Sequence, residues 1–271
     1  DKLIQRLRRQ LDDDAPPPDR LSPSPISSSA PAVSQSPSEP RLTSQRAPPL
    51  TLPWLQHRAI TKHIVELVEK ADWLDAGDDS AITPFRRVFG SVRHLIVQNM
   101  AFEDGTLFPW VRRHHSTLTS RPQAEHEELT GMWDDVAADV DKLAASATGS
   151  YLRRISLAKL QVALRCAQEI TSTHMTREEN LLTDIVATAT AQDQLEIVSQ
   201  AISAGAMMGS LVPLILHGLS QDQSVEYLST LQRFCPQRHP TWWSGVLSQL
   251  EDQMGKDWPA LQRALERESV M

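Results

Sequence analysis

The chain has 271 residues, a formal net charge of −7 at pH 7 and two cysteines. This length allows one large domain or two small ones, and the charged residues show no clustered basic face of the kind that binds nucleic acid. No apolar run approaches the roughly 20 residues that span a bilayer, and Cys166 and Cys235 are too few for a disulfide framework, a zinc ribbon or a RING domain. We therefore expect no nucleic-acid or membrane partner, and an intracellular location in the cytoplasm or nucleus.

Residues 1–50 differ in composition from the rest of the chain. They contain ten of the eighteen prolines, no glycine and a serine-rich run over residues 22–29. Such a segment cannot bury enough apolar surface to offset the entropy lost on ordering. We interpret it as a disordered Pro/Ser-rich linker.

Helical periodicity begins after this linker and predicts four helices within residues 51–190. The first runs over 53–74, with Pro53 suited to the first turn. The second runs over 83–109, with Thr83 as the N-cap and Pro84 at the first helical position. The third and fourth are expected over 122–145 and 150–187. The predicted fold is all-α, with an up-down four-helix bundle.

Residues 191–271 continue as shorter helices and form a predicted C-terminal extension. The expected breaks are at Gly205, Pro213, Gly218, Pro236 and Pro240. The segment from Ser220 to Gln223 reads as a helix-capping sequence. Residues 211–216 are too apolar to be left in solvent, so we expect the extension to pack on the bundle or on a neighbouring repeat.

Two similar tetrads carry the strongest chemical signal. Asn99 precedes Glu103 by four residues, and His174 precedes Glu178 by four residues. This spacing places both side chains of a pair on one helical face, about one turn apart. Glu103 follows Phe102, so its carboxylate enters an apolar interior, where it must be paired or bound to metal. Two such helices facing each other can hold a metal ion between them.

A single histidine on each of the other two helices completes the pattern: His57 on the first and His126 on the third. Four helices then each contribute nitrogen or oxygen donors, as in the carboxylate-bridged di-iron sites of helix bundles. The neighbours Ile170, Leu181 and Leu182 predict that the stripe bearing His174 faces inward.

Several polar residues near these positions have simpler interpretations. Glu179 is expected to orient a ligand or to lie in solvent, Asp104 to be a solvated acid, and Asn99 to form a hydrogen bond within the core. His63 is expected to be exposed on another face. His94 lies about 140° around the helix from Asn99 and is rejected as a substitute ligand. We expect structural or solvated roles for His114, His115, His217 and His239, and a core position for Cys166.

The order of these residues resembles the hemerythrin-like HHE cation-binding family over about residues 53–188. Within that family, the resemblance is closest to the hemerythrin repeats of BRUTUS-type iron-sensing ubiquitin ligases. It is carried by the segments Gln56–Ile60, Ala101–Asp104, His174–Glu179 and Ala206–Leu214. The resemblance implies a four-helix bundle that binds non-haem iron through histidines and bridging carboxylates and senses iron or oxygen.

The chain departs from the family pattern at two places. The second helix of the family carries a histidine where this chain has Asn99, and invertebrate hemerythrins have a further histidine where this chain has Thr130. The ligand set implied by the resemblance is His57, Glu103, His126, His174 and Glu178. The iron position near His57 then has few strong ligands. A di-iron centre, a single-iron site and a vestigial site all stay open.

Three hypotheses for function follow. The first is a non-enzymatic iron-binding module that senses iron or oxygen within a larger regulatory protein of the ubiquitin ligase type, whose ligase activity would need a RING domain elsewhere. Its partners would be the metal ion and other proteins or neighbouring hemerythrin repeats. The second is a degenerate, metal-free helical scaffold. The third, an oxygen carrier or di-iron oxidase, needs a fuller ligand set.

Overall fold

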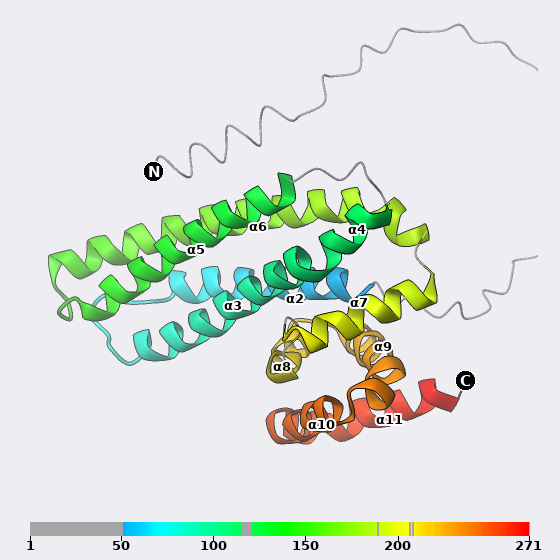
Figure 1. Cartoon of the computed structure of the whole chain (residues 1–271). Helices are drawn as coiled ribbons and strands as arrows, with labels where there is room; N and C mark the ends of the chain where they lie inside the picture. The colour runs from blue at the N-terminus through cyan, green and yellow to red at the C-terminus, as the bar shows by residue number, and fades with distance from the viewer. Residues whose placement is uncertain (1–50, 115–120, 189, 206, 208, 271) are drawn as a thin grey trace, which may run out of the picture. The chain divides into compact units, whose positions relative to one another are not determined.

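The computed structural model describes residues 51–114, 121–188, 190–205, 207 and 209–270 (Figure 1). Most of the described residues are helical, with no strand among them, so the predicted all-α class is confirmed. The linker predicted over residues 1–50 lies outside the described part. None of the described helices is long and apolar enough to cross a membrane.

Four long helices form the predicted bundle. They are α2 (Thr51–Asp72), α3 (Ile82–Phe102), α5 (Arg121–Ala145) and α6 (Tyr151–Thr188). Helix α2 packs on α3 and α6, and α5 packs on the same two helices, so the four enclose one core (Figure 1). Fully buried side chains such as Ile60, Trp133 and Leu164 fill that core.

The turns α2–α3 and α5–α6 meet at one end of the bundle. The backbone N–H of Gly149 donates to the carbonyl of Ala76 at 2.8 Å. The buried guanidinium of Arg153 pairs with Asp79 and donates to Thr148 at 3.0 Å. Gly149 has φ of 68°, a conformation that glycine adopts without strain. These contacts hold the two turns together at one end of the bundle. The start of α2 and the end of α3 therefore lie at the opposite end.

The start of α3 differs from the prediction. The helix begins at Ile82 with Ala81 as its N-cap, and the cap makes no side-chain hydrogen bond. The expected N-cap at Thr83 is therefore wrong, since Thr83 lies within the first turn. The preceding turn is closed instead by Asp78, whose carboxylate accepts from the backbone N–H of Ser80 at 2.7 Å.

The predicted second helix is interrupted rather than continuous. Helix α3 passes into a π-helical turn, η1 (Glu103–Leu107), and continues as α4 (Phe108–His114). A π-turn inserts one residue relative to an α-helix and occurs often at functional sites. The side chains after Glu103 are therefore rotated from the directions that a straight helix predicts.

The described residues of the extension form five further helices and two short 3₁₀ turns. They are α7 (Ala191–Ser203), η2 (Gly209–Leu211), α8 (Val212–His217), α9 (Gln221–Arg238), α10 (Pro240–Met254), η3 (Gly255–Asp257) and α11 (Trp258–Val270). The predicted cap at Ser220 is confirmed as a capping box with Gln223. The predicted break at Pro236 is wrong. A proline in the last turn of a helix removes only one backbone hydrogen bond, and α9 continues to Arg238.

The extension packs on the bundle through α8 and α9, which contact α2, and through α7, which contacts η1. A Cβ atom at Gly218 would lie 2.6 Å from the Cα of Ala59, so only glycine permits this approach. His63 Nε2 lies 2.8 Å from the carbonyl oxygen of Leu214. The prediction that His63 is exposed is wrong, because α8 covers it and leaves it buried.

Candidate metal centre

Five side chains singled out from the sequence converge inside the bundle. They are His57 from α2, Glu103 from η1, His126 from α5, and His174 and Glu178 from α6. All five are buried. They lie toward the end of the bundle opposite the paired turns, where α2 and α5 begin and α3 ends.

The five residues form two overlapping groups that share Glu178. One group is His57, Glu103 and Glu178, and the other is His126, His174 and Glu178; within each group the donor atoms lie within 4.8 Å of one another. The Oε2 atom of Glu178 is 3.5 Å from His174 Nε2 and 3.7 Å from His57 Nε2. This carboxylate therefore stands between two sets of imidazole donors.

Glu103 spans the same gap. Its Oε1 lies 2.8 Å from His57 Nε2, and its Oε2 lies 3.4 Å from His126 Nε2. The Nε2 atoms of His126 and His174 lie 3.0 Å apart. The geometry thus places one imidazole on one side and two on the other, with two carboxylates between them. Such an arrangement can hold one cation, or two cations bridged by carboxylate.

The carboxylate oxygens test whether this donor set fits a cation. Among the described residues, neither oxygen of Glu178 nor Oε2 of Glu103 has a hydrogen-bond partner. Both residues are almost fully buried, with 3% and 1% of their surface exposed. A buried carboxylate is unfavourable unless it is paired or bound to metal. The residues present therefore fit a metal ion of the kind that nitrogen and oxygen donors bind.

The protonation of the centre follows from its burial. Burial alone would lower the pKa of His57, but hydrogen bonds to Glu103 and Glu179 and the nearby negative charges raise it to about 10. Burial would raise the pKa of Glu103, but the hydrogen bond from His57 holds it below the usual value. Burial and the charge of Glu103 raise the pKa of Glu178 well above the usual value. The raised pKa values thus favour protonated His57 and Glu178, which lowers the negative charge of the metal-free centre.

Three partly exposed carboxylates contact the Nδ1 atoms of the three imidazoles. The pairs are His57 with Glu179 at 3.2 Å, His126 with Asp104 at 3.0 Å, and His174 with Glu125 at 2.9 Å. A carboxylate on Nδ1 fixes the tautomer and directs Nε2 toward a metal. Each imidazole is therefore oriented with Nε2 facing the centre.

One of these three carboxylates differs from expectation, and another had no predicted role. Asp104 was expected to be a solvated acid, but 34% of its side chain is exposed and it contacts His126. Glu125, which precedes His126 in the sequence, had no predicted role, and the structure pairs it with His174 on the facing helix. No spacing within one helix signals that pairing. Glu179 lies beside His57, as one of its two expected roles required.

The segment that carries these five residues is similar to a known protein family. Residues 52–186 match the model of the hemerythrin HHE cation-binding domain. This segment is a hemerythrin HHE domain. No curated protein and no solved structure gives a significant match to the chain. The matched segment extends from the start of α2 to near the end of α6, so it includes all five convergent residues.

Asn99 occupies a distinct place in the HHE domain. Its Nδ2 donates to Glu103 Oε1 at 2.6 Å, and both residues are buried. The expectation of a hydrogen bond within the core is therefore confirmed. The amide nitrogen holds the carboxylate oxygen that also faces His57, so Asn99 orients Glu103.

The remaining candidates lie away from the centre. His94 is exposed, His217 is exposed as one of its two expected roles required, and His239 contacts Ser199 at 3.0 Å. The side chains of His114 and His115 lie outside the described part. Of the two leucines expected to face inward, Leu182 is buried but Leu181 is 46% exposed, because consecutive helical residues point about 100° apart. Cys166 was expected in the core and is only half-buried.

Proposed function

We propose that the HHE domain binds non-haem iron at this centre and acts as a non-enzymatic sensor of iron or oxygen. The observation that carries the proposal is Glu178, which belongs to both donor groups and whose two buried oxygens have no hydrogen-bond partner among the described residues. The match to a cation-binding domain supports it. A shared carboxylate is how two metal positions are linked in bundle cores.

Each residue has a role in this proposal. His126, His174 and Glu178 would hold one iron, and His57, Glu103 and Glu178 would hold a second. Imidazole and carboxylate are both ligands that iron accepts. Bound iron would supply the reversible change between ferrous and ferric states that no side chain here provides. Asp104, Glu125 and Glu179 would orient the imidazoles.

The two metal positions differ in their number of imidazole donors. The His126 and His174 position has two imidazoles, whereas the position at His57 has one, with Asn99 committed to Glu103. Imidazole is a better donor to iron than a neutral amide. We infer that the first position fills at lower iron concentration and that the second fills only in excess iron.

Sensing would arise from the coupling of metal binding to stability. A ligand present at 100 times its dissociation constant adds about 2.7 kcal/mol to the free energy of unfolding. Helix α2 carries His57 and also contacts α8 and α9 of the extension. Loss of iron would thus loosen the helix on which the extension rests and change how partners or proteases meet the protein.

The wider setting is also a proposal. The resemblance of residues 56–60, 101–104, 174–179 and 206–214 to BRUTUS-type repeats supports a place within an intracellular, ubiquitin ligase-type regulator in the cytoplasm or nucleus. A RING domain would have to lie elsewhere, since this chain has two cysteines. Trp73, which is 88% exposed, and Tyr151, which is 69% exposed, offer apolar surface to a protein partner or a neighbouring repeat.

The test is anaerobic titration of the purified chain with Fe²⁺, followed by measurement of bound iron and melting temperature. The proposal requires at least one iron per chain and a raised melting temperature. The variant His174→Ala should lose the iron that binds at low Fe²⁺ concentration and the accompanying rise in melting temperature, whereas His94→Ala, at an exposed position, should keep both. A wild-type chain with neither bound iron nor a shift in melting temperature would overturn the proposal.

The alternative function is a metal-free helical scaffold. Two features favour it: asparagine rather than histidine at position 99, and the raised pKa values of His57 and Glu178, which favour their protonated forms and so reduce the buried negative charge without metal. The same titration separates the two functions. A scaffold would bind no iron, and His174→Ala would then leave the response to Fe²⁺ unchanged.

A further inference from the structure

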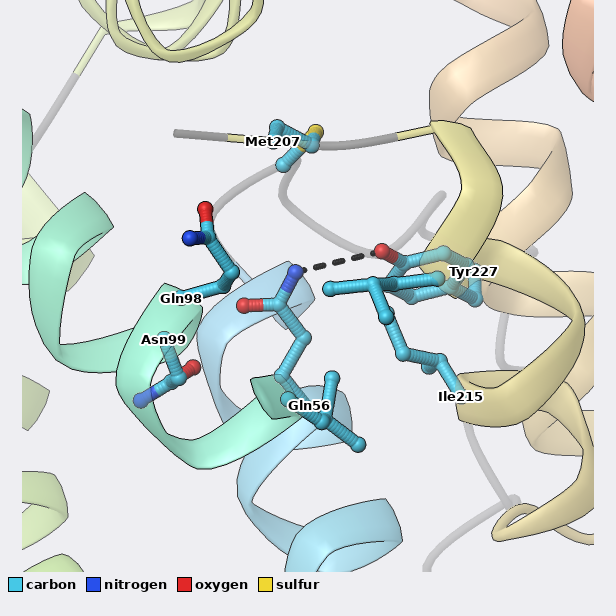
Figure 2. Close-up of a pocket in the computed structure, with 8 residues that line it drawn as sticks. Gln56, Gln98, Asn99, Met207, Ile215 and Tyr227 are labelled. Carbon is cyan, nitrogen blue, oxygen red and sulfur yellow. Dashed lines mark hydrogen bonds between the residues drawn. The ribbon is translucent and has the colours of Figure 1, made fainter. Parts of the chain in front are cut away.

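A small cavity of about 20 Å³ lies where the extension meets the bundle. Gln56 from α2 and Gln98 and Asn99 from α3 line its bundle side, and Met207, Ile215 and Tyr227 line its extension side (Figure 2). The cavity therefore borders residues directly next to the candidate metal centre, because Gln56 precedes His57 and Asn99 contacts Glu103.

Two amide oxygens of residues that line this cavity are buried and have no hydrogen-bond partner among the described residues. They are Oε1 of Gln56 and Oδ1 of Asn99, and the two residues are 6% and 5% exposed. The nitrogen of each amide is already committed: Gln56 Nε2 donates to Tyr227 Oη at 3.2 Å (Figure 2), and Asn99 Nδ2 donates to Glu103 Oε1. These donor bonds fix which way each amide points.

A buried acceptor without a donor is unfavourable, so two of them in one cavity indicate a ligand that donates two hydrogen bonds. A water molecule needs about 10–15 Å³ and two to four polar partners. The cavity has that volume, and the two oxygens are two such partners. The other lining side chains include Leu95, Met207 and Ile215, which are apolar and offer no hydrogen bond.

We propose that this cavity binds one water molecule, which donates hydrogen bonds to Gln56 and Asn99. The water completes a hydrogen-bond chain from Tyr227 in the extension to Glu103 in the metal centre. The part that concerns metal rests on the proposed function, since it takes Glu103 as a ligand. The chain of contacts runs through the Tyr227 hydroxyl, the Gln56 amide, the water, the Asn99 amide and the Glu103 carboxylate.

This assignment gives Gln56 and Tyr227 a role as positioning residues. They hold Asn99, and Asn99 holds the oxygen of Glu103 that faces His57. Residues that orient a metal ligand typically change metal affinity by about 10–100-fold when they are replaced. Burial raises the pKa of Tyr227 above its ordinary value, so its hydroxyl stays neutral beside the Gln56 amide. The extension would thereby tune the iron position at His57.

The first test uses the matched pair Gln56→Met and Gln98→Met. Both glutamines line the cavity, and methionine keeps their length without a polar end. Anaerobic Fe²⁺ titration should show about tenfold weaker binding at the weaker iron position in Gln56→Met, and less than a twofold change in Gln98→Met. Should Gln56→Met fail to fold, Tyr227→Phe removes only the hydroxyl and should weaken the same position. Equal affinities in all the folded variants would overturn the role of these residues.

The second test needs no metal. A crystal structure of the metal-free wild-type protein should contain a water within hydrogen-bond distance of Gln56 Oε1 and Asn99 Oδ1, and Gln56→Met should lack it. A dry cavity, or a water that contacts neither oxygen, would overturn the proposal. A wild-type chain that binds no iron but contains this water would overturn the proposed function and leave the water site standing.

Discussion

The Nε2 atom of His57 lies 2.8 Å from Oε1 of Glu103, and each side chain is 1% exposed. The two residues come from different helices and are 46 positions apart in the sequence. Their contact sets the chemistry of the metal-free centre, because it keeps a proton on the imidazole and a negative charge on the carboxylate. A cation that binds here must displace that proton.

The first prediction concerns pH. The folded pKa of His57, about 10, is above its ordinary value of 6.5, so its contribution to stability is fully present below pH 6.5 and is lost as the pH rises toward 10. The raised pKa of Glu178 acts in the same direction. The free energy of unfolding of the metal-free protein should therefore fall between pH 6.5 and 9.5, as measured by urea denaturation. His57→Gln should show a smaller fall; an identical pH dependence in the two proteins would contradict this account.

The second prediction is that iron affinity rises over the same pH range. Ligands must lose their protons before they bind a metal, so binding releases protons. Calorimetric titration in buffers of different ionisation enthalpy would count the released protons. The account expects at least one proton per chain at pH 7. A count of zero would mean that iron binding does not remove protons from His57 and Glu178, and it would contradict their assignment as ligands.

The third prediction separates Glu178 from Glu179. Glu178→Gln keeps the volume but removes the shared negative charge, so iron affinity should fall by more than about 100-fold, since even residues that only orient ligands contribute about 10–100-fold. The metal-free protein should be as stable as the wild type or more stable, because burial and the charge of Glu103 raise the pKa of Glu178 and so disfavour its charged form there. Glu179→Gln should weaken iron binding far less. Equal losses of affinity at the two positions would contradict the assignment.

The fourth prediction concerns Asn99. Replacing it with histidine places a second imidazole beside the metal position at His57, which has only one. The variant should bind a second iron at lower Fe²⁺ concentration than the wild type does, because imidazole is the better donor. Bound iron per chain is measured at increasing Fe²⁺. If Asn99→His does not change the stoichiometry at any concentration, the position at His57 does not bind metal.

The fifth prediction tests how closely the extension packs on the bundle. In Gly218→Ala the new methyl group would overlap Ala59, with its Cβ 2.6 Å from the Cα there. The free energy of unfolding should fall by about 1–3 kcal/mol. Gly90→Ala is the matched control, because nothing lies within 4 Å of its added Cβ and alanine favours a helix by about 0.5–1 kcal/mol. A neutral Gly218→Ala would argue against the close contact of α8 with α2.

Much of the bundle could be predicted from sequence because its signals are local. Apolar periodicity indicates the helices, and the four-residue spacing of His174 and Glu178 places two donors on one face. The five candidate ligands, which are His57, Glu103, His126, His174 and Glu178, converge in the structure. That they bind metal stays a prediction.

The features that could not be predicted depend on contacts between helices. Glu125 lies next to His126 in sequence but contacts His174 on the facing helix. His63 was expected in solvent because its own helix gives no sign that α8 will cover it. The π-turn at Glu103 also has no simple sequence signal, and it changes the direction of Asp104, which then reaches His126.

Anomalous diffraction at the iron absorption edge, from crystals loaded anaerobically with Fe²⁺, would locate iron bound in the bundle. The account predicts an iron peak between the Glu178 carboxylate and the Nε2 atoms of His126 and His174, with a second peak beside His57 and Glu103 in excess iron. Iron density found only on surface carboxylates, or none in the bundle core after loading, would contradict it.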